Sequence, residues 1–173
     1  MEQAIAYYNG KWMPKDECRL PMDDRGFQLG DALYEAERTF GETIFGLDLH
    51  MDRLFRSLRH VRIDPALTKE ELSQISYEVV KRNEHLRPKG GEFSIRQTIT
   101  RGRGGSVISN EPPTVYVSAT PMNFDRFGPL YDKGCHVVFA KTRSYHPDSL
   151  DPKVKHQSRM NFVLASLEAH DVD

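Results

Sequence analysis

The sequence predicts an α+β fold, with strands first, two helices next, and further strands and one helix in the second half. Three observations support this fold class. The pair Asn9-Gly10 stands between two short apolar stretches, which is typical of a β-hairpin. Two later stretches carry apolar residues at spacings of three and four, which predicts amphipathic helices. Residues 92–100 alternate in character, which predicts a strand with two different faces.

The overall composition is typical of a globular protein. Of the 173 residues, 38% are apolar and 28% are charged, and the net charge is −1. No basic run indicates a nucleic-acid partner, and no stretch approaches the ~20 apolar residues of a membrane span. The first residues lack the features of a secretion signal. We therefore expect a soluble, cytoplasmic protein in which Cys18 and Cys135 are reduced.

The first half is predicted to contain a hairpin, two polar turns, a pair of strands and two helices. The hairpin comprises 4–8 and 11–13, the turns lie at 23–26 and 30–31, and two strands between 33 and 44 join at 40–43. The first helix begins at about Asp48 and ends before Asp64-Pro65, because the residue before a proline disfavours helix. Thr68 and Glu71 form a capping box that begins the second helix.

The second half is predicted to contain three strands, a linker and a final helix. The strands are 92–100, 114–119 and 135–142, and the helix begins at about Gln157, with Met160, Val163, Leu164 and Leu167 as its buried stripe. These elements predict an N-terminal α+β domain at 1–120, an interdomain linker at 121–134, and the beginning of a C-terminal domain at 135–173. Because one strand and one helix leave their apolar faces without a partner layer, either another chain covers them or this domain is cut short.

Six side chains are candidates for chemistry: Tyr34, Arg53, Arg96, Arg101, Lys141 and Lys155. Arg53 can equally be a solvated helix residue, and Arg96 can belong to an ion pair on an exposed sheet face. Arg101 lies in a glycine-rich basic loop, which can bind an anion through backbone N–H groups and arginine forks. The local spacing does not separate Lys155 from Lys153. The histidines are scattered, and no metal site is predicted.

Five stretches, in order along the chain, resemble the class IV aminotransferases, the fold type IV group of pyridoxal-phosphate enzymes. They are 8–12; 24–27 with Gly30-Asp31 and Tyr34-Glu35; Leu47, His50, Arg53, Leu54 and Ser57; Arg96 with 100–102; and Lys155-His156 with Arg159, Asn161 and 163–165. Singly these matches are weak to moderate, but five in order over most of the chain form a strong signal.

The resemblance implies a two-domain fold type IV enzyme, whose N-terminal domain is complete here and whose C-terminal domain is only begun. It implies pyridoxal 5′-phosphate as cofactor, with Lys155 as the Schiff-base lysine that also moves a proton. Arg53 would bind the cofactor phosphate, and Tyr34, Arg96 and Arg101 would bind substrate. It also implies a homodimer.

The activity that the resemblance implies is transamination of a branched-chain L-amino acid or a D-amino acid with a 2-oxo acid acceptor. An aminodeoxychorismate lyase activity is a related alternative. Family members continue beyond residue 173, and that part carries the carboxylate that pairs with the pyridine nitrogen. We therefore expect the chain alone to bind the cofactor weakly, and a truncated, non-catalytic dimerising module is a third alternative.

Overall fold

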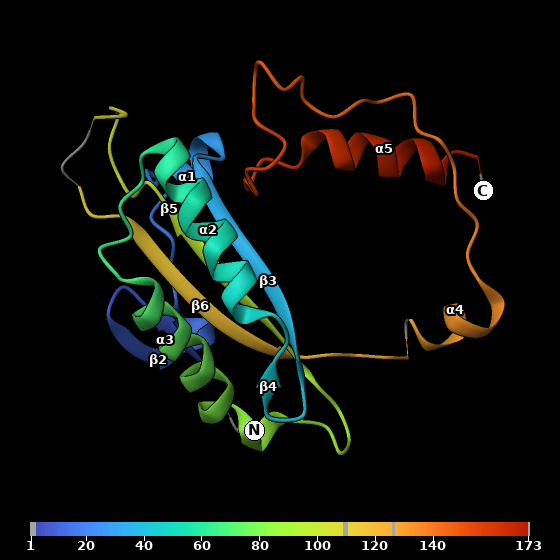
Figure 1. Cartoon of the computed structure of the whole chain (residues 1–173), viewed down its shortest axis with the longest axis horizontal. Coiled ribbons are helices and arrows are strands. Elements are labelled where there is room, and N and C mark those ends of the chain that lie inside the picture. The colour runs from blue at the N-terminus through green and yellow to red at the C-terminus, as the bar shows by residue number, and fades with distance from the viewer. Residues whose placement is uncertain (1–2, 109–110, 126, 173) are drawn as a thin grey trace. The chain divides into compact units, whose positions relative to one another are not determined.

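The computed structural model describes residues 3–108, 111–125 and 127–172, which divide into two compact units (Figure 1). The first unit comprises Met1–Met122 together with Val154–Ser158. The second comprises Asn123–Lys153 and Arg159–Asp173. The chain thus leaves the first unit after Met122 and returns to it for five residues.

The first unit is built on a six-stranded antiparallel sheet with the strand order β2-β1-β6-β5-β3-β4. The strands are β1 Ile5–Tyr8, β2 Lys11–Pro14, β3 Ala32–Phe40, β4 Thr43–Ile44, β5 Phe93–Thr100 and β6 Thr114–Pro121. Asn9 and Gly10 both have positive φ, 46° and 83°, as the tight turn between β1 and β2 requires. The predicted hairpin is confirmed.

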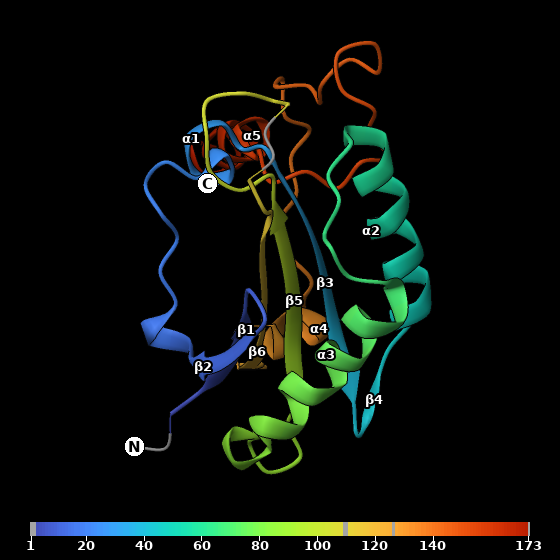
Figure 2. The ribbon, with the colours of Figure 1, turned by 90° about the vertical axis from the view of Figure 1, so that its left-hand side faces the viewer.

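Two long helices cover one face of this sheet, as the side view in Figure 2 shows. They are α2 Leu47–Val61 and α3 Lys69–Arg82. The predicted capping box at the start of α3 is confirmed: Glu71 N–H donates to Thr68 Oγ1 at 3.1 Å, and Thr68 N–H donates to Glu71 Oε2 at 2.7 Å.

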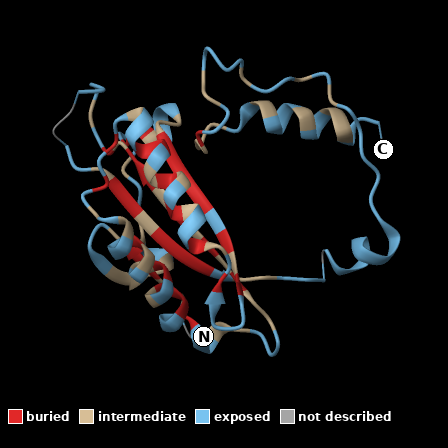
Figure 3. Ribbon diagram, viewed as in Figure 1, coloured by how far each residue is buried: buried red, intermediate tan, exposed pale blue. Residues whose placement is uncertain are grey.

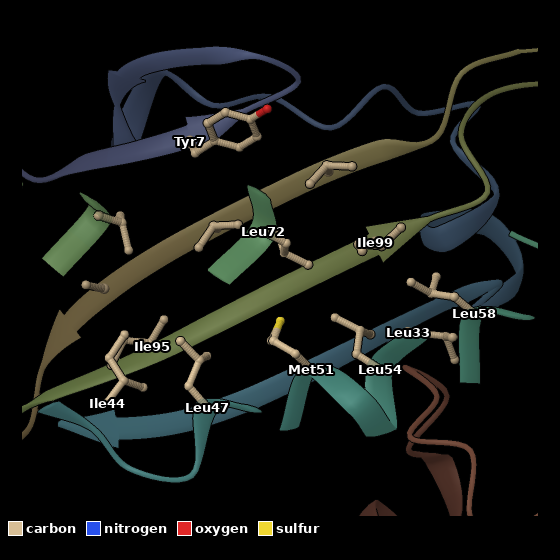
Figure 4. Packing of buried hydrophobic residues seen from close by; sticks show 14 of the residues in the cluster. Tyr7, Leu33, Ile44, Leu47, Met51, Leu54, Leu58, Leu72, Ile95 and Ile99 are labelled. Atoms are coloured by element: carbon tan, nitrogen blue, oxygen red, sulfur yellow. The ribbon is translucent and has the colours of Figure 1, made fainter. Parts of the chain in front are cut away.

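The core lies between the helices and the sheet (Figure 4). Met51, Leu54 and Leu58 of α2 and Leu72 of α3 are almost completely buried there. The predicted alternation of β5 is also confirmed. Phe93, Ile95, Gln97 and Ile99 face the helices and are fully buried, whereas Ser94, Arg96 and Thr98 are half-buried on the opposite face. Buried residues concentrate in the sheet and in the helices that cover it (Figure 3). We call that opposite face the open face.

The first of the two predicted polar turns belongs to a short helix, α1 Arg25–Leu29. Asp24 caps its start by accepting from Gly26 N–H at 2.7 Å, and Gly30 ends it in the left-handed conformation, with φ 68°. Two short 3₁₀ helices, Lys15–Glu17 and Glu84–Leu86, complete the first unit.

The second unit contains two helices, α4 Gly128–Lys133 and α5 Met160–His170. The predicted strand at 135–142 was wrong, because all of these residues are described and none lies in a strand. α4 lies inside the stretch predicted as a linker, and α5 begins at Met160 rather than at Gln157. None of the described helices is long and apolar enough to span a membrane.

The predicted buried stripe of the last helix was also wrong. Met160, Val163, Leu164 and Leu167 are all about half exposed or more, and no residue of α5 is buried. The spacing of these residues is helical, but an apolar stripe is buried only where another layer packs on it.

Candidate active site

The returning segment Val154–Ser158 lies along the edge of β3. Tyr34 N–H donates to the carbonyl of Lys155 at 3.2 Å, and Gln157 N–H donates to the carbonyl of Ala32 at 2.8 Å. Leu33 and His156 form an antiparallel bridge. β4 pairs with the other end of the same edge, so the segment occupies the part of β3 that β4 leaves open. These backbone bonds fix the position of Lys155.

Three of the predicted residues meet around one aromatic ring on the open face. Lys155 Nζ lies 4.4 Å from the centre of the Tyr34 ring, and Arg96 Cζ lies 4.0 Å from it. Arg96 also donates to Gln157 Oε1 at 2.9 Å and to Thr98 Oγ1 at 3.3 Å. Tyr34 is almost fully buried by these neighbours. Cation–π attraction therefore holds two positive groups beside one ring.

Arg53 of α2 lies on the opposite, helix-covered face of the sheet, where Glu35 of β3 binds it. Its Nε and Nη2 donate to the two carboxylate oxygens of Glu35 at 2.5 and 2.6 Å. His50 Nδ1 lies 2.9 Å from Glu35 Oε2. Burial alone would raise the pKa of Glu35, but the hydrogen bonds from Arg53 and His50 outweigh burial and hold that pKa below its ordinary value. Glu35 is therefore ionised and orients a guanidinium whose side chain remains 39% exposed.

A second carboxyl, that of Glu37, lies on the same face of β3. Its Oε1 is 3.7 Å from His50 Nδ1, and a contact with the Gln97 side chain opposes the effect of burial on its pKa without cancelling it. Burial raises the pKa of Glu37 to about 8, and the nearby charge of Glu35 contributes in the same direction. Glu37 is therefore protonated at neutral pH.

Arg101 lies apart from this group. Its guanidinium pairs with Asp31 at 2.7 Å and donates to the carbonyls of Val61 and Arg62 at 2.9 and 3.0 Å. These carbonyls belong to the end of α2, where a cation is favourable. Arg101 thus joins the end of β5 to the end of α2, and its predicted contact with substrate stays a prediction.

The other two lysines weighed in the sequence, Lys141 and Lys153, belong to the second unit. Lys141 donates its backbone N–H to Glu168 within that unit. Lys153 is exposed and also belongs to the second unit, whereas Lys155 belongs to the first. The structure thus separates Lys155 from Lys153, which the local spacing could not do.

Six polar side chains in these contacts received no role from the sequence: Asp31, Glu35, Glu37, His50, Thr98 and Gln157. Glu35 and His50 stood inside the matched stretches, but only the folded chain brings them to Arg53. Two acids at alternate positions of one strand, on the face that also carries Leu33, were a usable signal, because carboxyls on a buried face are unusual.

The family model for class IV amino-transferases matches residues 32–173. A putative branched-chain-amino-acid aminotransferase of Methanocaldococcus jannaschii is 32% identical over 168 residues, and the match covers 95% of this chain and 55% of that protein. A D-alanine aminotransferase of Bacillus licheniformis is 35% identical over 96 residues, covering 56% of this chain and 32% of that protein.

A likeness to solved structures agrees with these matches. The branched-chain aminotransferase of the archaeon Thermoproteus uzoniensis, solved with norvaline, is 20% identical with a TM-score of 0.79, covering 98% of this chain and 57% of that one. This likeness shows the shared fold. The chain spans about half the length of the Methanocaldococcus relative and of the solved structure. On the family match and the archaeal relative together, the chain belongs to the class IV aminotransferase family.

Proposed function

We propose that this chain carries the N-terminal domain and the reactive lysine of a pyridoxal-phosphate aminotransferase, which moves an amino group from an amino acid to a 2-oxo acid. The observation that supports this most directly is the group formed by Lys155, Tyr34 and Arg96. Arg53 is bound nearby, by Glu35, the residue that follows Tyr34 in β3. The relatives are named as a putative branched-chain-amino-acid aminotransferase and a D-alanine aminotransferase, so branched-chain L-amino acids and D-amino acids are the two donor classes we propose.

The residues present fit the cofactor. Lys155 lies at the edge of β3. Tyr34 contacts Lys155 on the open face, and the next residue, Glu35, binds Arg53 on the helix-covered face. A ligand lying along this edge can therefore present an aldehyde to the amine and a phosphate to the guanidinium. When bound, the cofactor supplies an electron sink for the bond-breaking step.

Lys155 has two tasks in this proposal. Its amine would hold the cofactor through the aldehyde carbon, with the aldehyde oxygen leaving as water, and the same amine would carry a proton to and from the substrate α-carbon. The Tyr34 ring, 4.4 Å away, holds Nζ in place. Arg53 provides a planar fork for the phosphate, and because Glu35 fixes one edge of that fork, little ordering remains when the anion binds.

Arg96 is the better of the two candidates for the substrate carboxylate. Its hydrogen-bond partners, Gln157 and Thr98, are neutral, so they leave its charge available to an anion. Arg101, by contrast, uses Nε, Nη1 and Nη2 in bonds to Asp31 and to the carbonyls of Val61 and Arg62, so neither edge of its guanidinium is left open as Nη1 of Arg53 is. We also propose that the protein is a homodimer, because a second chain would cover exposed apolar side chains such as those of α5. We propose that it is cytoplasmic.

The experiment that tests the proposal is an absorption spectrum of the chain after incubation with pyridoxal 5′-phosphate. Because we expect the chain alone to bind the cofactor weakly, the cofactor is titrated to high concentration; we then expect a visible band for the wild type and for Lys153→Ala, and loss of that band for Lys155→Ala. The two lysines are close in sequence, so Lys153→Ala controls for non-specific reaction with amines. No band in the wild type, or a band that survives in Lys155→Ala, would contradict the proposal and favour the non-catalytic alternative.

A further inference from the structure

A row of side chains runs across the open face from Lys155 to the far strands. Tyr34 contacts Lys155 and lies opposite Thr98 of β5. Thr98 lies opposite Tyr116 of β6, and Tyr116 lies opposite Tyr8 of β1. Residues that are directly opposite in an antiparallel sheet project from the same face. The row therefore places three tyrosines and the reactive lysine on one surface.

The far end of this row borders a cavity of about 210 Å³. Its wall residues include Tyr8, Cys18, Leu20, Thr98 and Tyr116. Thr98 thus borders the cavity on one side and accepts a hydrogen bond from Arg96 on the other. The cavity is a direct neighbour of the group around Tyr34.

Most polar groups in the lining are already bound within the protein. Tyr8 donates to the carbonyl of Arg19 at 2.8 Å, and Lys15 donates to Thr120 Oγ1 at 2.7 Å. Arg19 itself donates to two nearby carbonyls. Burial raises the pKa values of Tyr116 and Cys18, so both groups stay uncharged. Lys15 and Arg19 keep further N–H donors, but most of the lining consists of ring faces and aliphatic carbon, which favour an apolar or aromatic group.

Resting on the proposed function, we propose that this cavity receives the distal end of the amino donor, and that the preferred donor carries an aromatic ring at the end of a short carbon chain. Neighbouring strands are about 4.8 Å apart, so the path from Tyr34 across Thr98 to Tyr116 is roughly 10 Å. Donors as small as alanine or valine do not reach that far. A ring joined to the reacting carbon through a few methylene groups reaches the cavity and stacks on Tyr116.

A binding experiment tests the cavity without the cofactor reaction. The probe is a fluorophenyl-butanoate, which has the ring and the carboxylate of such a donor but no amine, and fluorine NMR reports its binding to the full chain. We expect saturable binding to the wild type. Thr98→Trp, which fills the cavity, and Tyr116→Ala, which removes a wall, should each weaken affinity by about tenfold or more. Thr43→Trp, on the exposed edge strand β4, adds the same ring elsewhere and should bind as the wild type does.

The visible band with pyridoxal 5′-phosphate is measured on the same proteins, which separates the two proposals. If the Lys155-dependent band forms but the probe fails to bind, or binds all four proteins equally, the cavity assignment is overturned and the proposed function stands. If the probe binds selectively but the band never forms, the proposed function fails, and the assignment of this cavity to an amino donor fails with it.

Discussion

Arg53 and Arg96 are both oriented by neighbouring side chains in the folded chain. Glu35 accepts two hydrogen bonds from Arg53, and Gln157 accepts one from Arg96. The entropy cost of fixing these long side chains therefore falls on folding rather than on ligand binding. The two arginines differ in charge balance, because a carboxylate faces Arg53 and a neutral amide faces Arg96.

Glu37 gives the free energy of unfolding a predictable pH dependence. Burial raises the pKa of Glu37 from 4.5 to about 8, so between these values the folded carboxyl keeps its proton while the unfolded one ionises. The folded state then binds more protons, and stability decreases as the pH rises through this window. We expect Glu37→Gln, which keeps a neutral side chain of the same shape, to remove most of the decrease and to be more stable than the wild type by about 2 kcal/mol near the upper end of the window.

The measurement is urea unfolding at about pH 5 and about pH 8. Glu42→Gln is the matched control, because Glu42 is an exposed carboxyl in the turn before β4 and its neutralisation should leave the pH dependence unchanged. Parallel pH profiles for the wild type and Glu37→Gln would show that Glu37 ionises normally in the folded chain.

At the residue scale, sequence reasoning named the side chains that meet around Tyr34 better than it named their hydrogen-bond partners. Lys155, Tyr34 and Arg96 were all named in advance, and the structure brings them together. Gln157 was not named, because its contact with Arg96 depends on how the returning segment aligns with β3. Nor could sequence reasoning foresee that Arg101 binds the end of α2, since this contact depends on packing between distant elements.

The corner between α1 and β3 supports the segment that carries Lys155. Gly30 has φ 68°, and a Cβ there would lie 3.2 Å from Ser158 Cβ. We expect Gly30→Ala to lower stability by about 1 kcal/mol through its left-handed backbone, and also to displace Ser158. Because Ser158 ends the returning segment, the variant should weaken formation of the visible band with pyridoxal 5′-phosphate, which an absorption titration measures.

Gly10→Ala is the control for this prediction. Gly10 also has a positive φ, 83°, but a Cβ there would meet nothing within 4 Å. It should cost a similar amount of stability in urea unfolding and leave the titration unchanged. Equal titration curves for all three proteins would mean that Ser158 adjusts without moving Lys155.

Elements with strong local signals were predictable, and elements that depend on partners were not. The Asn9-Gly10 turn and the Thr68–Glu71 capping box carry their own stabilising contacts. A strand needs a neighbour, and residues 135–142 have none; the backbone N–H of Thr142 instead donates to the Glu168 side chain at 3.0 Å. The sequence predicted polar turns where α1 forms, because only five residues lie between its capping residues Asp24 and Gly30.

At the scale of the whole molecule, the two units differ in how much core they contain. The first has a sheet, two covering helices and a contiguous core, whereas no residue of the two helices in the second unit is buried. We expect trypsin to cut the stretch between Met122 and Val154 first, at Lys133, Lys141, Arg143 or Lys153, because an exposed backbone without core contacts opens easily.

A time course followed by mass spectrometry measures this order of cleavage. Lys81 and Arg82 are basic residues in the last turn of α3, and they serve as internal controls for sites held in the packed unit. Early cleavage there would contradict the difference in core content. The family and the general order of elements were predictable at this scale, but the return of Val154–Ser158 to β3 was not, because no local pattern encodes that pairing.

That return has a consequence for biosynthesis. The sheet and both covering helices are encoded before Met122, whereas the segment bearing Lys155 leaves the ribosome only after the intervening stretch has been translated. Domains fold as units while synthesis proceeds, and long-range pairings form after local ones. A nascent chain can therefore complete its scaffold before Lys155 is made, and the amine that we propose as the reactive group arrives in a late docking event at the β3 edge.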